Sequence, residues 1–256
     1  MANNDRYHRL VDLLRQKGRL AVAFSGGVDS TLVLAAAREA AGADVIALFA
    51  RSRLQKEIVV QRVVSSCRQM GVTLRMVEID PFSWPGFVAN GDNRCYLCKK
   101  GIYATFLALL AKGTVLLDGT NVDDLCRHRP GLQAVRELGV WMPLVEAGLG
   151  KEEIRAVSRA MGLASWNLPS ESCLATRIIT GCTLEPRLLD LVEAAEAFLE
   201  GHGFAGCRVR LDGSAVFVTV PAGHQRARLA APPLRLELAN ILAKGDYAKV
   251  FLDLSE

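Results

Sequence analysis

The sequence lacks the long apolar runs that would place a chain of 256 residues in a membrane. No window approaches the roughly 20 consecutive apolar residues of a membrane-spanning helix, although 50% of the residues are hydrophobic. The segment from Met1 to Leu10 is polar and lacks the apolar core of a signal peptide. We therefore expect a soluble, cytoplasmic protein without a membrane partner.

Blocks of like charge are also missing, and the formal net charge at pH 7 is only +4. Nucleic-acid binders usually carry a broad basic surface or an added basic domain. The charge balance therefore indicates no nucleic-acid partner, but it suits a phosphorylated small molecule. The chain has no internal repeat and no low-complexity segment, so its length fits one large domain or two modest ones.

Seven cysteines are many for a cytosolic chain, and their spacing is not that of a small disulfide scaffold. Cys95 and Cys98 form a C-x-x-C pair, and Cys173 lies in a polar loop. The pair fits half of a zinc site, a redox pair or two cysteines facing a core. No second C-x-x-C and no C-x-x-H completes a zinc site. Three thiolates would suit an iron–sulfur cluster with one iron open to a non-protein ligand.

The other cysteines give weaker signals. We expect Cys67 and Cys207 to be small buried hydrophobic residues, which is the common state of a cysteine without a motif. Cys126 and Cys182 lie in polar loops and remain undecided.

The most informative pattern in the chain is one hexamer, Ser25-Gly26-Gly27-Val28-Asp29-Ser30. It follows the apolar run 20–24 and precedes a helical pattern. The glycines let the backbone approach a phosphate, and the serines and loop amides can donate hydrogen bonds at the positive end of the helix dipole. No Gly-Lys-Ser/Thr follows, which excludes a Walker A loop. The hexamer resembles the PP-loop of the ATP pyrophosphatases, which cleave ATP to AMP and pyrophosphate.

The first part of the chain alternates strands and helices. The pattern predicts strands at 20–24, 44–49, 73–79 and 115–117, and helices at 10–17, 30–41, 56–70 and 96–111. Such alternation indicates a parallel sheet, whose ligands bind outside the carboxyl ends of the strands. The hexamer lies at such an end. So do Gly119, Thr120, Asn121 and Asp123, which are therefore candidates for the nucleotide site.

The character of the sequence changes after about Leu168. A polar loop at 169–183 precedes a predicted helix at 187–200, a hairpin of strands 207–211 and 215–220, a helix at 234–243 and a strand at 249–254. We predict a Rossmann-like α/β domain at 1–168 and a smaller α+β domain at 169–256.

Seven segments of the chain carry a more specific pattern. They are 21–30, Arg94-Cys95-Tyr96-Leu97-Cys98-Lys99, 118–124, Arg129-Pro130-Gly131-Leu132, 137–140, 151–155 and Cys173-Leu174-Ala175-Thr176-Arg177. Together they resemble the LarE family of ATP-dependent sulfurtransferases, within the PP-loop ATP pyrophosphatase superfamily. The resemblance runs from the N-terminus to about Leu211, and it implies the adenine nucleotide alpha hydrolase-like fold of that superfamily.

The resemblance implies an activity. In this family, ATP adenylylates a carboxylate of pyridinium-3,5-biscarboxylic acid mononucleotide, and a protein-held sulfur then displaces AMP to give a thiocarboxylate. The product is a precursor of the nickel-pincer nucleotide cofactor. One branch of the family sacrifices the cysteine matching Cys173. The other has three cysteines, matching Cys95, Cys98 and Cys173, and is thought to hold a [4Fe-4S] cluster that carries an extra sulfide. This chain has all three.

The resemblance implies roles for Arg208, Arg210 and Glu196, and general chemistry suggests roles for Asp29 and Arg177. Arg208 and Arg210 would bind the phosphate of the substrate, and Glu196 would bind a metal ion. Mg²⁺ would neutralise the phosphates of ATP, with Asp29 as its loop carboxylate. Arg177, four residues after Cys173, would act in catalysis by lowering the pKa of that thiol or by holding a phosphate. We also expect a homo-oligomer and an association with other proteins that make the nickel-pincer cofactor.

Other functions share parts of this pattern. A PP-loop tRNA thiolase would have the loop and three cysteines, but it should also carry a broad basic surface. An amide-forming PP-loop ligase that uses ammonia gives Cys95 and Cys98 no role. A non-enzymatic nucleotide sensor or zinc-stabilised binding module needs the site but no turnover.

Overall fold

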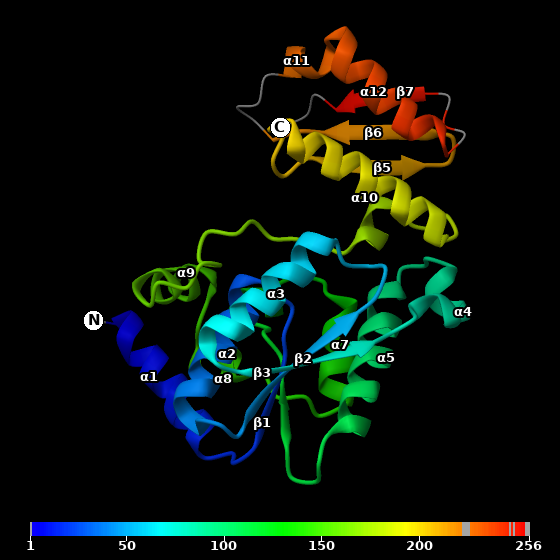
Figure 1. The fold of residues 1–256 in the computed structure, drawn as a ribbon. Helices are drawn as coiled ribbons and strands as arrows, with labels where there is room; N and C mark the ends of the chain where they lie inside the picture. Colours follow the sequence, from blue (N-terminus) through cyan, green and yellow to red (C-terminus); the bar gives the residue numbers. More distant parts are fainter. Residues whose placement is uncertain (1, 222–225, 246, 248, 254–256) are drawn as a thin grey trace. The chain divides into compact units, whose positions relative to one another are not determined.

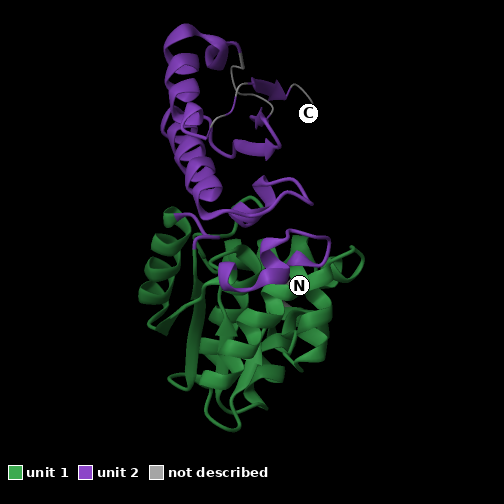
Figure 2. Ribbon diagram, turned by 90° about the vertical axis from the view of Figure 1, so that its right-hand side faces the viewer, with its two compact units in different colours: residues 1–52, 57–81, 95–171 green, residues 53–56, 82–94, 172–256 purple. Residues whose placement is uncertain are grey.

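The computed structural model of the chain describes residues 2–221, 226–245, 247 and 249–253. The chain forms two compact units, which Figure 2 distinguishes by colour. The first unit contains residues 1–52, 57–81 and 95–171, and the second contains 53–56, 82–94 and 172–256. The predicted division into 1–168 and 169–256 treats each domain as one continuous segment, so it does not anticipate the short segments 53–56 and 82–94.

The first unit is built on a parallel sheet, as the sequence predicts. Its strands are β1 (Leu20–Ala23), β2 (Val45–Arg51), β3 (Thr73–Glu78) and β4 (Val115–Leu117). The strand order is β3-β2-β1-β4, and all neighbouring pairs are parallel. Figure 1 labels β1, β2 and β3. The chain adds β2 and β3 on one side of β1 and then β4 on the other. The topological switch point of the sheet therefore lies between β1 and β4.

Helices connect and cover these strands. They are α1 (Ala2–Arg15), α2 (Val28–Ala41), α3 (Glu57–Met70), α5 (Arg94–Leu109), α6 (Val122–Leu125), α7 (Pro130–Glu137), α8 (Pro143–Ala147) and α9 (Lys151–Ala160). The helix predicted at 10–17 begins much earlier, because Tyr7, Leu10, Val11 and Leu14 form one buried face at helical spacing. Helices α6 to α9 correspond to no element predicted from the sequence.

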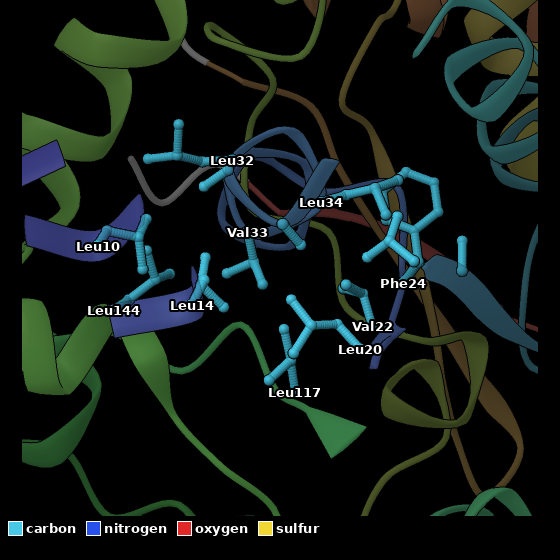
Figure 3. Close-up of a cluster of buried hydrophobic side chains, with 14 of the residues drawn as sticks. Leu10, Leu14, Leu20, Val22, Phe24, Leu32, Val33, Leu34, Leu117 and Leu144 are labelled. Atoms are coloured by element: carbon cyan, nitrogen blue, oxygen red, sulfur yellow. The ribbon is translucent and has the colours of Figure 1, made fainter. Parts of the chain in front are cut away.

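The core of the first unit lies between the helices and the sheet (Figure 3). Helix α1 packs against α2, α8 and α9, and α2 also packs against α9. Leu10 and Leu14 of α1 and Leu144 of α8 meet Val33 of α2 in this cluster, and Leu117 of β4 joins them. Each fully buried side chain of this size stabilises the fold by about 1.5–3 kcal/mol. This packing holds the ends of β1 and β4 in place.

The second unit is a small mixed α+β structure. Its elements are η1 (Pro81–Ser83) at its border with the first unit, α4 (Pro85–Val88), η2 (Leu174–Arg177), α10 (Pro186–Gly201), β5 (Arg208–Asp212), β6 (Ala215–Thr219), α11 (Arg226–Ala230), α12 (Pro232–Ala243) and β7 (Lys249–Asp253). The predicted hairpin is present, because β5 and β6 pair antiparallel across Asp212 and Ala215. Strand β7 pairs parallel to β6, and the last residue of its predicted range, Leu254, lies outside the described residues.

A buried asparagine joins the segment 82–94 to the loop that follows η2. Asn90 has a φ of 55°, in the left-handed region that asparagine tolerates better than most residues. Its Nδ2 donates to the carbonyl oxygens of Ile179 at 2.8 Å and Cys182 at 2.7 Å. The amide of Gly181 donates to the carbonyl oxygen of Asn90 at 2.9 Å. The segment 82–94 is therefore an integral part of the second unit.

Within the described residues, no helix combines the length and the apolar character that crossing a membrane requires.

Candidate functional site

The predicted nucleotide residues gather at the switch point of the sheet. The hexamer 25–30 follows β1, and the loop Asp118–Asn121 follows β4. Because β1 and β4 are parallel neighbours, both loops lie at the same edge of the sheet. Ligands of open parallel sheets bind in the crevice at this position. The fold therefore brings the two candidate loops together.

The hexamer forms a tight loop that ends at the first turn of α2. Gly26 has a φ of 73°, which favours glycine, and Gly27 is the N-cap residue of the helix. The Ser30 hydroxyl lies 3.1 Å from that of Ser25 and donates to the Gly27 carbonyl oxygen at 3.2 Å. A glycine N-cap has no side chain to occupy the first amides of α2. These amides can therefore bind an anion, as at other helix N-termini.

Two glycines let their loops pack against neighbouring helices more closely than larger residues would allow. A Cβ atom on Gly119 would lie 3.0 Å from the backbone nitrogen of Ser30, so the loop after β4 packs directly on the start of α2. A Cβ atom on Gly26 would lie 2.9 Å from Cγ2 of Val63 in α3. The two loops and two helices are therefore packed closely around the amides of α2.

Asp118 organises the loop after β4. Its carboxylate accepts hydrogen bonds from the backbone amide of Thr120 at 2.7 Å and from the hydroxyls of Thr120 and Tyr103, and Lys99 Nζ lies 2.9 Å away. Burial acts to raise the pKa of Asp118, but the Lys99 charge and these hydrogen bonds outweigh it and hold the pKa below its usual value. Asp118 is thus an ionised structural centre, and the contributions of Lys99 and Tyr103 were not predicted.

A second polar group links the loop after β4 to α2 and α9. Asn121 caps α6 by accepting the amide of Asp124 at 3.2 Å, and its Nδ2 donates to Asp29 Oδ1 at 3.2 Å. Lys151 Nζ lies 2.6 Å from Asp29 Oδ2. Asp123 accepts the backbone amide of Lys151 at 2.6 Å. The structure thus connects the predicted residues Asp29, Asn121 and Asp123, and it adds Lys151, which the sequence analysis missed.

The cysteines of the predicted cluster belong to both units. Cys95 and Cys98 lie in the first turns of α5, with Cys95 exposed and Cys98 half-buried. Cys173 is half-buried and is the N-cap residue of η2 in the second unit. Among the residues that the structure describes, no group of three or more His, Cys, Asp or Glu side chains is arranged to hold a metal ion. A cluster on these three thiols therefore remains a prediction.

Arg177 and Glu196 meet in a buried ionic group of the second unit. Arg177 Nε donates to Glu196 Oε1 at 2.7 Å, and Lys56 Nζ lies 2.6 Å from Glu196 Oε2. The amide of Val209 also donates to Glu196 at 2.9 Å. Burial acts to raise the pKa of Glu196, but the hydrogen bonds from Arg177 and Lys56 lower it below its usual value. Metal binding by Glu196 stays a prediction, and an incoming ion would compete with two cations for this carboxylate.

Arg177 also contacts the segment that carries Cys173. Its Nη1 donates to the Ser172 hydroxyl at 2.7 Å and to the Thr176 hydroxyl at 3.0 Å. The amide of Leu174 donates to the carbonyl oxygen of Leu54 at 2.9 Å. The turn at Cys173 is therefore fixed from both flanks.

Arg208 and Arg210 lie on one face of β5, as alternation predicts. Val209 and Leu211, on the opposite face, are buried, whereas Arg210 is exposed and Arg208 half-exposed. Both guanidinium groups can thus reach a ligand outside the sheet. Their binding of a substrate phosphate remains a prediction.

The four cysteines outside the predicted cluster differ in burial. Cys67 and Cys207 are buried, as expected, and burial raises their pKa values to about 11 and about 12. Cys126 is exposed and Cys182 half-buried. The two buried thiols are therefore kept neutral and packed.

Comparison with known proteins identifies the family. No protein-family model matches the chain. It is 33% identical over 215 residues to the pyridinium-3,5-bisthiocarboxylic acid mononucleotide synthase of Lactiplantibacillus plantarum, covering 83% of this chain and 78% of that protein. It is 34% identical over 205 residues to an uncharacterized protein of Synechocystis, covering 79% and 76% of the two chains. An uncharacterized protein of Methanocaldococcus jannaschii is 29% identical over 199 residues, covering 75% of this chain and 73% of its own length. The chain, with its glycine loop at the switch point of a parallel sheet, belongs to the LarE family of ATP-dependent sulfurtransferases.

Proposed function

We propose that this protein uses ATP to activate a carboxylate of pyridinium-3,5-biscarboxylic acid mononucleotide and replaces a carboxylate oxygen with sulfur. One observation carries the proposal. The hexamer 25–30 and the loop 118–121 meet at the switch point of a chain that is 33% identical to a synthase of the bisthiocarboxylic acid mononucleotide. The products are AMP, pyrophosphate and a thiocarboxylate, which is a precursor of the nickel-pincer cofactor.

The glycine loop supports the activation step. The amides at the start of α2 and the hydroxyls of Ser25 and Ser30 would bind the pyrophosphate part of ATP. Gly119, Thr120, Asn121 and Asp123 would complete the nucleotide site from the side of β4. A carboxylate oxygen of the substrate attacks the α-phosphorus, and pyrophosphate leaves with the electron pair of the broken bond. The loop donors would stabilise the charge that develops on the leaving group.

Asp29 fits a magnesium site. Mg²⁺ in nucleotide sites is usually bound by one or two carboxylates together with phosphate oxygens. The Asp29 carboxylate lies at the start of α2, close to where the phosphates would bind. The ion would supply charge neutralisation, and Asp29 would orient it.

The sulfur step would use the cysteines. A sulfur nucleophile attacks the adenylylated carbonyl carbon, and AMP leaves with the carboxylate oxygen. Cys95 and Cys98 are three positions apart on α5, so they lie on one face of the helix and fit as two ligands of an iron–sulfur cluster. Cys173 would be the third ligand. The cluster would supply a sulfide, and the alternative source is the sulfur of Cys173 itself.

The second unit would hold the substrate and the sulfur donor in place. Arg208 and Arg210 would bind the phosphate of the substrate through charge-assisted hydrogen bonds. Arg177 has its guanidinium on Glu196, so its contacts favour a role in positioning the Cys173 turn over direct contact with the substrate.

The test is anaerobic turnover with ATP, Mg²⁺ and the biscarboxylic acid mononucleotide, followed by mass spectrometry of the nucleotide and of Cys173. We expect AMP, pyrophosphate and a product in which sulfur replaces oxygen. Loss of H₂S from Cys173 would identify a sacrificed cysteine, whereas an intact residue after transfer would identify the cluster. Release of pyrophosphate without a sulfur-containing product would contradict the proposal.

Variants separate the two half-reactions. Cys173→Ala should abolish sulfur transfer but spare adenylylation and the release of pyrophosphate, because no thiol takes part in the attack on the α-phosphorus. Anaerobically prepared protein should contain about four irons per chain, and Cys95→Ala should lose most of them. Cys126→Ala is the matched control, because Cys126 is also exposed but lies outside the motif. Unchanged iron content in Cys95→Ala would refute the cluster.

A further inference from the structure

Lys151 makes an ion pair that the proposed chemistry does not use. Its side chain extends from the first turn of α9 to the first turn of α2, where Nζ lies 2.6 Å from Asp29 Oδ2. The side chains of Lys151 and Asp29 are 33% and 24% exposed, so solvent and small ions can reach the pair. The ammonium thus contacts a side chain of the first turn of α2, the turn whose amides the glycine loop presents.

A lysine at this place is electrostatically unfavourable for both helices. The N-terminus of a helix carries a partial positive charge, which repels a cation. Lys151 is the first residue of α9, and its ammonium also lies at the start of α2. Asp29 compensates for this charge within the protein. If an ion such as Mg²⁺ takes Asp29, the ammonium needs another anion close by.

The backbone of Lys151 is held firmly, so its side chain can exchange partners without moving the helix. Its amide donates to Asp123 Oδ2 at 2.6 Å. The preceding Gly150 is in close contact with the same carboxylate, because a Cβ there would lie 3.2 Å from Asp123 Oδ2. Asn121 Nδ2 holds the other oxygen of Asp29 at 3.2 Å. The long side chain of Lys151 and the Oδ2 atom of Asp29 are therefore the groups that can change partners.

We propose that Lys151 and Asp29 exchange partners when magnesium and ATP bind, so that Lys151 becomes a binding residue for the pyrophosphate that leaves. This inference rests on the proposed function, which supplies ATP and Mg²⁺. The Asp29 carboxylate turns from the ammonium to the ion. The ammonium turns to the β- and γ-phosphoryl oxygens. When the bond to the α-phosphorus breaks, the electron pair stays on pyrophosphate, and Lys151 stabilises the added charge.

The effects of the two charges on pyrophosphate affinity can be distinguished by titrating the protein with inorganic pyrophosphate in a calorimeter. In EDTA, Lys151→Met should weaken pyrophosphate binding about tenfold to a hundredfold, the loss typical of one charge-assisted hydrogen bond. Asp29→Asn should bind pyrophosphate as tightly as the wild type or more tightly in EDTA, because the ammonium is released from its carboxylate. With Mg²⁺ present, Asp29→Asn should instead bind more weakly than the wild type.

The different effects of the two variants on pyrophosphate affinity in EDTA distinguish a ligand-binding lysine from a purely structural ion pair. If the pair only held the loop together, both variants would weaken binding alike, and this result would overturn the inference. Wild-type affinity in Lys151→Met would also overturn it, as would a wild-type protein that binds no pyrophosphate. Lys112→Met is the matched control, because Lys112 is an exposed lysine in the turn before β4, away from the loop. Should Lys151→Met fail to fold, Lys151→Gln with Asp29→Asn gives the same comparison, because glutamine also removes the positive charge.

The test is independent of sulfur chemistry. Lys151-dependent pyrophosphate binding without any thiocarboxylate product would contradict only the proposed function. Thiocarboxylate formation by a Lys151→Met protein with wild-type pyrophosphate affinity would contradict only the role of Lys151.

Discussion

Glu196 shows how a single buried carboxylate can organise its surroundings. Its side chain is 0% exposed, and two cations and one backbone amide share its oxygens. A buried charge is tolerated only when such partners replace the lost water. One of the partners, Arg177, also contacts the turn that begins at Cys173. The charge of Glu196 therefore stabilises the local geometry of a predicted functional residue.

The lowered pKa of Glu196 makes this stabilisation dependent on pH. The contribution is present above the ordinary value of 4.5 and is lost as the pH falls through the lower pKa of the folded state. Near neutral pH we expect Glu196→Gln to reduce the free energy of unfolding by ~3–5 kcal/mol, because Arg177 and Lys56 lose their buried counter-charge. The difference between variant and wild type should shrink in acid.

Denaturant titrations at a series of pH values measure this difference. Glu193→Gln is a suitable control, because Glu193 lies on the same helix but is only half-buried. A Glu196→Gln penalty that stays constant as the pH falls would show that the carboxylate charge is not responsible.

The sequence identified functional residues that belong to a short motif. It missed residues whose role depends on a partner far away in the sequence. The glycines and serines of the loop were found because they are adjacent and have characteristic turn chemistry. Lys151 and Lys56 were missed because each resembles an ordinary surface lysine until the fold brings it to Asp29 or Glu196. Glu196 was singled out only through the family resemblance, and its pairing with Arg177 was not foreseen.

Among the elements, the contact between the loop after β4 and helix α2 sets the geometry of the nucleotide site. Gly119 lies against backbone atoms of Ser30, which cannot yield as a flexible side chain can. An added side chain at Gly119 would push the loop after β4 and the start of α2 apart. The amides that would bind pyrophosphate would then move as well.

Gly119→Ala is expected to lower both stability and nucleotide affinity. The added methyl group would meet the Ser30 nitrogen at 3.0 Å, and overpacking of this kind costs about 1–3 kcal/mol. Thermal unfolding and ATP titration measure the two effects. Gly201→Ala is the control, because a Cβ there meets open space. Unchanged ATP affinity in Gly119→Ala would show that the loop contact does not shape the site.

Elements with strong local patterns were predicted well. The strands of the parallel sheet were found because short apolar runs end at turn residues, and α2 was found because it follows the glycine loop. Helices α6 to α9 were missed, since three of them have eight residues or fewer and offer little periodicity. The parallel pairing of β7 with β6 was also unforeseen, because it depends on a connection through α11 and α12 rather than on a local turn.

At the scale of the whole molecule, the second unit is assembled from three separate stretches of chain. The segment 53–56 supplies Lys56 to Glu196 and the carbonyl oxygen of Leu54 to Leu174. The segment 82–94 supplies the side chain of Asn90 to the loop after η2. Residues 172–256 alone therefore lack several partners of their buried polar groups.

We expect a fragment of residues 169–256 to be unable to form the native second unit. Glu196 would lose Lys56, and the loop 178–182 would lose the two hydrogen bonds from Asn90. Unpaired buried groups each cost about 1–3 kcal/mol, which is large for so small a core. Circular dichroism during denaturation measures the outcome, with the full chain as control. A fragment that unfolds cooperatively would show that the short segments are dispensable.

The discontinuous second unit has a consequence for recombination between related genes. A gene that exchanged only its 3′ third with a relative would carry residues 172–256 away from the Lys56 and Asn90 that complete them. Such a chimera would combine halves that had not evolved together. We therefore expect the segment 172–256 alone to be a poor unit of exchange between genes. Substitutions at Glu196 and Lys56 should instead be accepted or rejected as a pair.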